Sequence, residues 1–78
     1  MTEPKNAIGP QLMQMRSRLG LSQEKLAAKC QLAGWDVSRD IIARIELQIR
    51  CVTDIELIKI SRILHVPVDS LLIKGRKN

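Results

Sequence analysis

The amino-acid sequence predicts an all-α fold, a compact single domain of five short helices. Three observations lead to this prediction. The chain has 78 residues, which is enough for one small hydrophobic core and too few for two. Its apolar residues are mainly ten leucines and ten isoleucines, and they recur at helical spacing. Helix-capping residues, glycines and prolines separate the periodic segments, and few signals typical of strands occur.

The first helix is expected to follow a flexible arm formed by residues 1–7, which lack apolar periodicity, so that ordered structure begins at Ile8. Pro10 suits a first helical position, because the N–H that proline lacks would have no partner there. Gly20 is placed to end this helix. The face expected to point inward consists of Leu12, Met15 and Leu19.

The second and third helices are expected to begin at the N-caps Ser22 and Ser38. The second should end near Leu32 or Ala33, since Gly34 can adopt the left-handed conformation just beyond. Its inward residues are Leu26, Ala27 and Cys30. The third helix, over about 38–47, has an apolar face formed by Ile42 and Ile45. Its opposite face carries Arg39, Asp40, Ala43 and Arg44.

The fourth helix is expected to begin with a capping box formed by Thr53 and Glu56. Its inward face consists of Leu57, Ile60 and Leu64, extended by Ile58 and Ile63. Pro67 should stop it, because a residue that precedes proline disfavours the helical region. A last short helix from Val68 to Ile73 and a basic tail over residues 74–78 complete the chain.

The charge of the chain indicates an anionic partner. Thirteen Lys and Arg against eight Asp and Glu give a net charge of +5 and a pI near 9.8. Residues 16–50 contribute +3, with seven basic and four acidic side chains, residues 51–73 contribute −1, and the tail contributes +3. The aromatic fraction is only 1%, which argues against a module that stacks single-stranded bases on aromatic rings.

Catalytic and metal-binding patterns are missing from the sequence, so we expect neither an enzyme nor a cofactor. Cys30 and Cys51 are 21 positions apart without a second pair, and His65 is the only histidine. We interpret Cys30 as a small buried residue and Cys51 as an accessible one. No secretion signal or run of apolar residues long enough to span a membrane occurs, so a cytoplasmic protein without membrane association is expected.

The segment over residues 22–46 has the properties of a DNA-reading helix pair. Two helices pack through their aliphatic faces, and the second presents forked side chains near its N-terminus, as reading of base edges in the major groove requires. Those side chains are Arg39, Asp40 and Arg44. Ser22, Gln23 and Ser38 lie at helix N-termini, where backbone N–H groups can bind phosphate.

A family resemblance follows from the residues in this segment and around it. The matching residues are Ile8-Gly9, Arg16, Gly20-Leu21-Ser22-Gln23-Glu24, Leu26-Ala27, Val37-Ser38-Arg39, Ile42 to Glu46, and Leu64 to Leu72. From Ile8 to Leu72 the chain resembles the Cro/repressor-type helix-turn-helix family, also called the xenobiotic-response-element family of bacterial and phage regulators. The resemblance implies a five-helix lambda-repressor-like DNA-binding domain over residues 8–73, with a recognition helix at 38–47.

The resemblance also implies a role for individual residues on DNA. Gln23 would bind phosphate and hold the recognition helix, and Ser38 would contact phosphate. Arg39, Asp40 and Arg44 fall where the family reads bases. Ala43 would either meet a thymine methyl group or serve only as a small helix former. Arg50 falls where relatives contact the DNA backbone.

Two charged positions carry further expectations. Arg16 and Glu46 match a pair that in this family forms a largely buried salt bridge, although two independent surface charges would fit the sequence as well. Asp40 either stabilises the helix start, accepts a hydrogen bond from a cytosine amino group, or orients Arg39.

One departure from the family concerns the connection between the second and third helices. Seven residues separate Cys30 from Ser38, which is longer than in most relatives and leaves the angle between the two helices open. Trp35 is expected to fill the core beneath this connection rather than to stack on DNA.

The function expected from these features is that of a homodimeric transcriptional regulator, most simply a repressor, on a palindromic double-stranded DNA operator. The candidate dimer interface is Ile49, Leu71, Leu72 and Ile73, although the two leucines could instead close the core of one protomer. No small-molecule effector is expected. The alternative is a helical protein-interaction module, and a phage repressor, a restriction-modification controller and an antitoxin are not separated.

Overall fold

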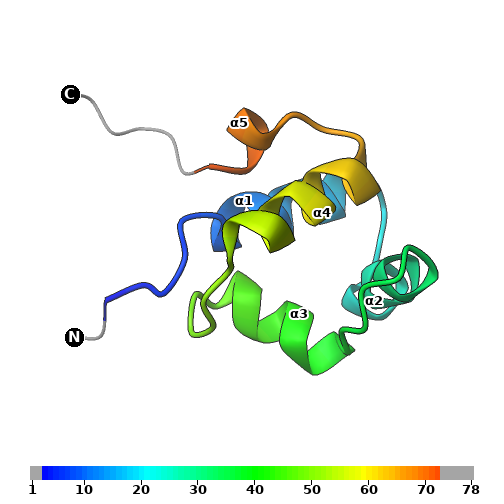
Figure 1. Ribbon diagram of the computed structural model, residues 1–78, viewed down its shortest axis with the longest axis horizontal. Coiled ribbons are helices and arrows are strands. Elements are labelled where there is room, and N and C mark those ends of the chain that lie inside the picture. Colours follow the sequence, from blue (N-terminus) through cyan, green and yellow to red (C-terminus); the bar gives the residue numbers. More distant parts are fainter. Residues whose placement is uncertain (1–2, 73–78) are drawn as a thin grey trace.

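The computed structural model describes residues 3–72, and five helices form within that range (Figure 1). They are α1 (Gly9–Arg18), α2 (Gln23–Leu32), α3 (Arg39–Glu46), α4 (Asp54–Leu64) and α5 (Val68–Leu71). No strand occurs between residues 3 and 72, so the predicted all-α, five-helix fold is confirmed. Ile73 and the basic tail at 74–78 lie outside the described residues.

The helices form a bundle in which α3 and α5 lie on opposite sides of α1 and α4 (Figure 1). Helix α3 packs against both α2 and α1, whereas α5 packs against α1 and α4. The outer side of α3 is therefore open to solvent. Within residues 3–72, no helix has the length and apolar character needed to cross a membrane.

Three helices begin where the sequence predicts. The hydroxyl groups of Ser22 and Ser38 each accept a hydrogen bond from the backbone N–H three residues on, at 3.0 Å and 3.3 Å. Thr53 and Glu56 form the predicted capping box, in which each side chain accepts from the other's backbone N–H at 3.1 Å. These bonds satisfy N–H groups that the first helical turn leaves unpaired.

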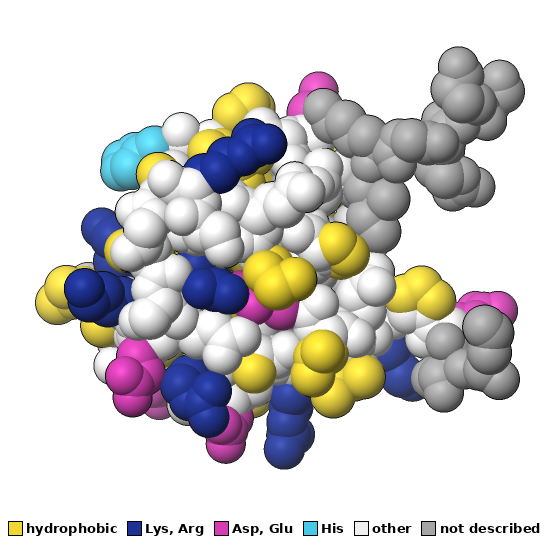
Figure 2. Space-filling model, turned by 180° about the vertical axis from the view of Figure 1, so that it is seen from behind, with side chains coloured by type: hydrophobic (Ala, Val, Ile, Leu, Met, Phe, Trp, Pro, Cys, Tyr) yellow, Lys and Arg dark blue, Asp and Glu magenta, His cyan; other side chains and the backbone are white. Residues whose placement is uncertain are grey.

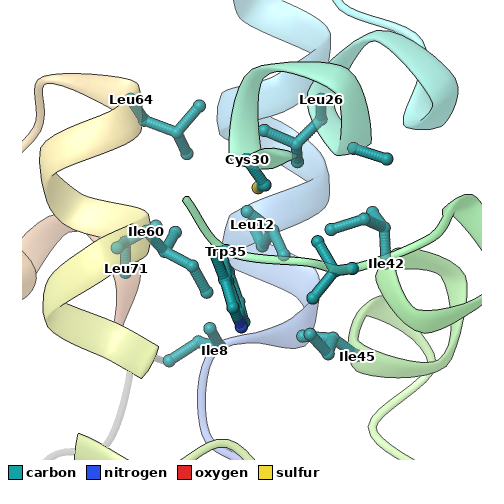
Figure 3. Packing of buried hydrophobic residues seen from close by; sticks show 12 residues of the cluster. Ile8, Leu12, Leu26, Cys30, Trp35, Ile42, Ile45, Ile60, Leu64 and Leu71 are labelled. Atoms are coloured by element: carbon teal, nitrogen blue, oxygen red, sulfur yellow. The ribbon is translucent and has the colours of Figure 1, made fainter. Parts of the chain in front are cut away.

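The core is aliphatic and is completed by Trp35 (Figure 3). The largest side chains that are fully buried are Leu12, Leu26, Cys30, Ile42, Ile45 and Leu71. The Trp35 ring lies between the helices, close to Leu12, Ile8 and Ile60 in the view of Figure 3, and only 7% of the residue is exposed. Trp35 therefore fills the core, as predicted.

Hydrogen bonds with residues at the end of α2 hold the long connection between α2 and α3 in place. The N–H of Trp35 donates to the carbonyl of Cys30 at 2.8 Å, and Gly34 makes the turn with a φ of 91°. The side chain of Gln31 donates to the carbonyl of Val37 at 2.7 Å, and Val37 is itself buried. These contacts fix the start of α3 relative to α2.

The start of α1 is in close contact with the end of α3. A Cβ atom at Gly9 would lie 2.7 Å from the carbonyl oxygens of Ile45 and Glu46 and from the Cγ of Gln48. Only glycine allows two backbones to approach this closely. The end of α3 is thus set directly against the start of α1.

Several expectations about single residues are wrong. Leu19, expected to point inward, is 51% exposed because α1 ends at Arg18 and Leu19 lies beyond its last turn. Ile58 is also exposed. The fourth helix ends at Leu64, before Val66 and Pro67 as expected, and His65 ends it with a left-handed φ of 58°. The last helix ends at Leu71 rather than Ile73.

Candidate nucleic-acid interface

The outer face of α3 presents polar side chains, as the sequence predicts. Ile42 and Ile45 are buried, whereas Arg39, Asp40 and Arg44 are exposed on the other side of the helix. Ala43 is half-buried between the two faces. The strong division between an apolar and a polar side fixes which residues can meet a partner.

Arg39 and Asp40 interact at the start of the helix. The Arg39 Nη2 atom lies 3.6 Å from the Asp40 Oδ1 atom, and both side chains are more than half exposed. This is the arrangement expected if Asp40 orients Arg39. Asp40 also lies in the first turn, where a carboxylate favours the helix dipole.

Gln23 connects Arg39 to the interior. Its Oε1 atom accepts a hydrogen bond from Arg39 Nη1 at 3.2 Å, and its Nε2 atom donates to Glu46 Oε1 at 2.9 Å. One side chain at the start of α2 therefore contacts both the first and the last residue of α3. This position matches the holding role that the family resemblance implies.

Glu46 is the centre of this network, and it pairs with Arg16 as expected. Arg16 Nε donates to Glu46 Oε2 at 2.6 Å, and Arg16 Nη2 donates to Oε1 at 3.1 Å. Only 3% of the Glu46 side chain and 14% of the Arg16 side chain are exposed. The hydrogen bonds to Glu46 raise the pKa of Arg16. The remaining Arg16 donor, Nη1, binds the carbonyl of Leu21 at 2.8 Å, so α1, the following turn, α2 and α3 meet at one carboxylate.

Asn6 is a site residue that sequence reasoning missed. Its Oδ1 atom accepts from the N–H groups of Ile8 and Gly9, at 3.0 Å and 2.8 Å. Its Nδ2 atom donates to the carbonyls of Ile45 and Arg50, at 3.0 Å and 2.8 Å. Asn6 thus binds N–H groups at the start of α1 and carbonyl groups at and after the end of α3, and ordered contacts begin before Ile8. The tendency of asparagine side chains to bind the backbone two residues on was the available signal.

Gln48 completes the same junction. Its side chain donates to the carbonyl of Asn6 at 2.9 Å, and its backbone carbonyl accepts from the N–H of Lys5 at 2.9 Å. Gln48 has a positive φ of 63°, which turns the chain sharply after α3. The segment expected to be a free arm is therefore bound to the end of the recognition helix at Lys5 and Asn6.

The Arg50 side chain is paired within the chain. Its guanidinium forms a fork with Glu56, through contacts of 3.2 Å and 3.1 Å, and also donates to the carbonyl of Cys51 at 3.0 Å. The hydrogen bond from Arg50 holds the pKa of Glu56 below its ordinary value. The structure thus gives Arg50 a role in joining the loop after α3 to α4.

Of the residues expected at the dimer interface, the structure buries one and exposes two. Leu71 is fully buried and closes the core of one protomer, so it is not available to a second chain. Ile49 and Leu72 are exposed, and Ile73 lies outside the described residues.

The two cysteines are placed as expected, Cys30 inside and Cys51 at the surface. Burial raises the pKa of the Cys30 thiol to about 11, which makes it unreactive. Among the residues described, no group of three or more His, Cys, Asp and Glu side chains is placed to hold a metal ion.

Two packed helices with a polar outer face on the second define a helix-turn-helix DNA-binding domain. The helix-turn-helix family model HTH_3, of the Cro/C1 type, matches residues 12–71, and the chain belongs to this family. Membership of this family makes the protein a DNA-binding transcriptional regulator and not an enzyme. Comparison with curated proteins gave no match.

Solved structures agree with this assignment. The DNA-binding domain of BldD is 27% identical with a TM-score of 0.76, over 94% of this chain and 99% of that one. The restriction-modification controller protein C.AhdI from Aeromonas hydrophila is 29% identical with a TM-score of 0.69, over 83% of this chain and 87% of that one. A hypothetical transcription factor, NHTF from Neisseria, shares the fold at 23% identity and a TM-score of 0.75, over 94% of this chain and 78% of that one.

We predict that Glu46→Ala destabilises the protein by about 3–5 kcal/mol, because it leaves the Arg16 guanidinium buried without its partner. So large a loss approaches the whole stability of a small domain. Glu46→Gln, which keeps the size and part of the hydrogen bonding, should lose less. Thermal and urea unfolding followed by circular dichroism measure both. The control is Asp36→Ala at an exposed acidic residue, expected within about 0.5 kcal/mol of wild type. An unchanged melt of Glu46→Ala would contradict the prediction.

We also predict a pH-dependent contribution from the Arg50–Glu56 pair. The pKa of Glu56 is lowered in the folded state, so the pair stabilises the protein above the unfolded pKa of about 4.3. That stabilisation is lost as pH falls through the lower, folded pKa. The stability difference between wild type and Arg50→Ala should therefore be present at neutral pH and shrink in acid, as urea midpoints at a series of pH values will show. The control Arg18→Ala should give a difference that does not change with pH. If the difference for Arg50→Ala is equally constant, the pair does not couple to folding.

Proposed function

We propose that this protein is a sequence-specific repressor that binds a palindromic operator as a homodimer, with α3 in the major groove. The observation that carries the proposal is the set of contacts at α3. The exposed Arg39 is held through Gln23 by a buried ion pair at the far end of the same helix. A base-reading side chain needs such a fixed position, because discrimination depends on hydrogen-bond geometry.

Arg39 and Arg44 are the proposed base readers. Both are exposed on the outer face of α3, and a guanidinium can make two hydrogen bonds to a guanine edge. Asp40 directs Arg39 by its ion pair, which favours orientation over contact with cytosine. Ala43 lies between them and is half-buried, so its methyl group is available to a thymine only in part.

Phosphate contacts are proposed for the two capped helix starts. Ser22, Gln23 and Ser38 lie there, and the N–H groups of the first helical turns favour an anion. Arg50 already uses its fork on Glu56, so we propose that it acts on DNA binding by holding the loop after α3.

A homodimer is supported by apolar side chains at the surface. Ile49 and Leu72 remain from the predicted interface, and three further apolar residues are exposed at the end of α3 and the start of α4, namely Leu47, Ile55 and Ile58. A two-fold dimer would place two recognition helices about 34 Å apart, one turn of DNA. The likeness to C.AhdI supports control of restriction-modification genes as a second candidate role.

The experiment that tests this proposal is enrichment of bound sequences from random duplex DNA. We expect an inverted repeat whose half-site centres are about 10 bp apart, bound by two protomers. Sedimentation of the complex counts the protomers. Enrichment of a single asymmetric site occupied by one protomer would overturn the homodimer, and no enrichment would overturn sequence specificity.

On the selected operator, we predict that Arg39→Ala or Arg44→Ala costs about 1–3 kcal/mol and relaxes the preference at one base position. The matched control is Arg39→Lys, which keeps the charge and loses the fork. It should lose the base preference while keeping affinity for non-operator DNA. The slope of log affinity against log salt, about 0.9 per phosphate neutralised, separates the two effects in titrations. A uniform loss on all sequences would reject these residues as base readers.

A further inference from the structure

A shallow groove lies between the C-terminal ends of α2 and α4. It consists of three adjoining hollows of about 280, 260 and 220 Å³, and Ile63 lines all three. Figure 2 shows this edge of the molecule, where dark blue and yellow side chains lie near the cyan histidine. None of the residues proposed to read bases lines the groove.

The chemistry of the groove combines apolar surface with positive charge. Leu32 is 89% exposed at one side, and Leu19, the residue expected in the core, lines the other. The cationic side chains around it are Lys29, Lys59 and Arg62, with His65 beside them. Among the lining residues, all within 3–72, none is acidic.

None of the cations of the groove forms an ion pair in the described part of the chain, although Lys59 lies near enough to Glu56 to help lower the pKa of that carboxyl. The ion pairs between residues 3 and 72 are Arg16–Glu46, Arg39–Asp40 and Arg50–Glu56. Three cations around the exposed Leu32 and the partly buried Ile63 are complementary to a ligand that is both apolar and acidic.

We propose that this groove binds an acidic amphipathic helix of a partner protein. The apolar face of such a helix would lie on Leu32 and Ile63, and its carboxylates would meet Lys29 and Arg62. Helices bind apolar grooves in this manner through side chains spaced three and four residues apart.

Other occupants fit the groove less well. A DNA backbone would match the charge but gain nothing from the exposed leucines. The chain's own residues 74–78 carry three basic and no acidic side chains, so they would be repelled. A second copy offers Asp54, Ile55 and Ile58 at the start of α4, but this would be head-to-tail packing of two different surfaces, which does not close a dimer.

The position of the groove allows a partner and DNA to bind together. Gln23 at the start of α2 belongs to the DNA face, whereas Leu32 at its end lines the groove. Ten helical residues separate these ends by about 15 Å. A partner protein bound in the groove would thus accompany this protein to its operator, because the partner and the DNA would occupy different surfaces.

The test uses the full chain and a fluorescein-labelled synthetic amphipathic helix with leucines on one face and glutamates on the other. Fluorescence anisotropy should show binding, and a peptide with lysines in place of the glutamates should not bind. The double variant Lys29→Glu/Arg62→Glu should weaken binding by about tenfold or more, about 1.4 kcal/mol. The matched double variant Lys5→Glu/Arg44→Glu, with the same charge change at exposed residues that do not line the groove, should change peptide binding less than about twofold. Lys29→Arg/Arg62→Lys should bind like wild type.

Leu32→Ser tests the apolar part separately, and because Leu32 is so exposed, this variant should melt like wild type. Equal binding of both peptides, equal loss in the two charge-reversed variants, or no effect of Leu32→Ser would overturn the proposal. Displacement of the peptide by non-operator duplex would identify the groove as a DNA surface. Self-association lost only in the groove variants would identify a second copy as the occupant. None of these results depends on the operator, so the proposed repressor function is tested independently.

Discussion

The structure depends on one buried carboxylate, that of Glu46. An ionised side chain with 3% exposure is costly to bury unless its oxygens are all paired. Here Arg16 supplies two hydrogen bonds and Gln23 a third, so the pairing brings α1 and the start of α2 to the end of α3. An ion pair constrains direction and distance more narrowly than apolar contact does. The carboxylate therefore determines how α3 is turned, and with it the direction of every side chain on the outer face.

Apolar packing and polar contacts have different parts in positioning α3. Ile42 and Ile45 bury its inner face and hold it against the core, but aliphatic contacts tolerate small rotations. The polar contacts are directional and lie at both ends of the helix. Gln23 contacts Arg39 at the start, while Asn6 binds the Ile45 carbonyl near the end. Between these two fixed ends, eight residues have little freedom to shift in register.

The sequence is sufficient for features that depend on local contacts. The caps at Ser22 and Ser38 and the capping box at Thr53 are correct, because each involves residues only three positions apart. The residues that were missed act over long separations. Asn6 binds carbonyls 39 and 44 positions away, and helical periodicity contains no information about such contacts. Arg50 shows the same limit at short range, since its six-residue link to Glu56 runs through a loop of unpredictable path. Leu19 was wrongly expected to point inward, and the sequence left open whether Leu71 lies in an interface or in the core, because burial depends on where a helix ends and on what then packs against it.

The two ends of α2 belong to two different surfaces of this small domain, the proposed DNA-binding face and the proposed peptide groove. At its start, Ser22 caps α2 itself and Gln23 binds Arg39 and Glu46 of α3, on the side proposed to face DNA. At its end, the side chains of Leu32 and Lys29 line the groove. Leu26 and Cys30, between them, are buried and hold the helix rigidly in the core. The exposed Leu32, beside Lys29 and Arg62, adds nothing to the stability of the monomer, because its side chain gains no burial and the neighbouring positive charges repel each other. In the long connection that follows α2, Trp35 is buried in the core and, together with Ala33, lines one hollow of the groove, whereas Leu32 just before the connection is exposed. The extended connection, the main departure from the family pattern, therefore both fills the core and shapes the groove.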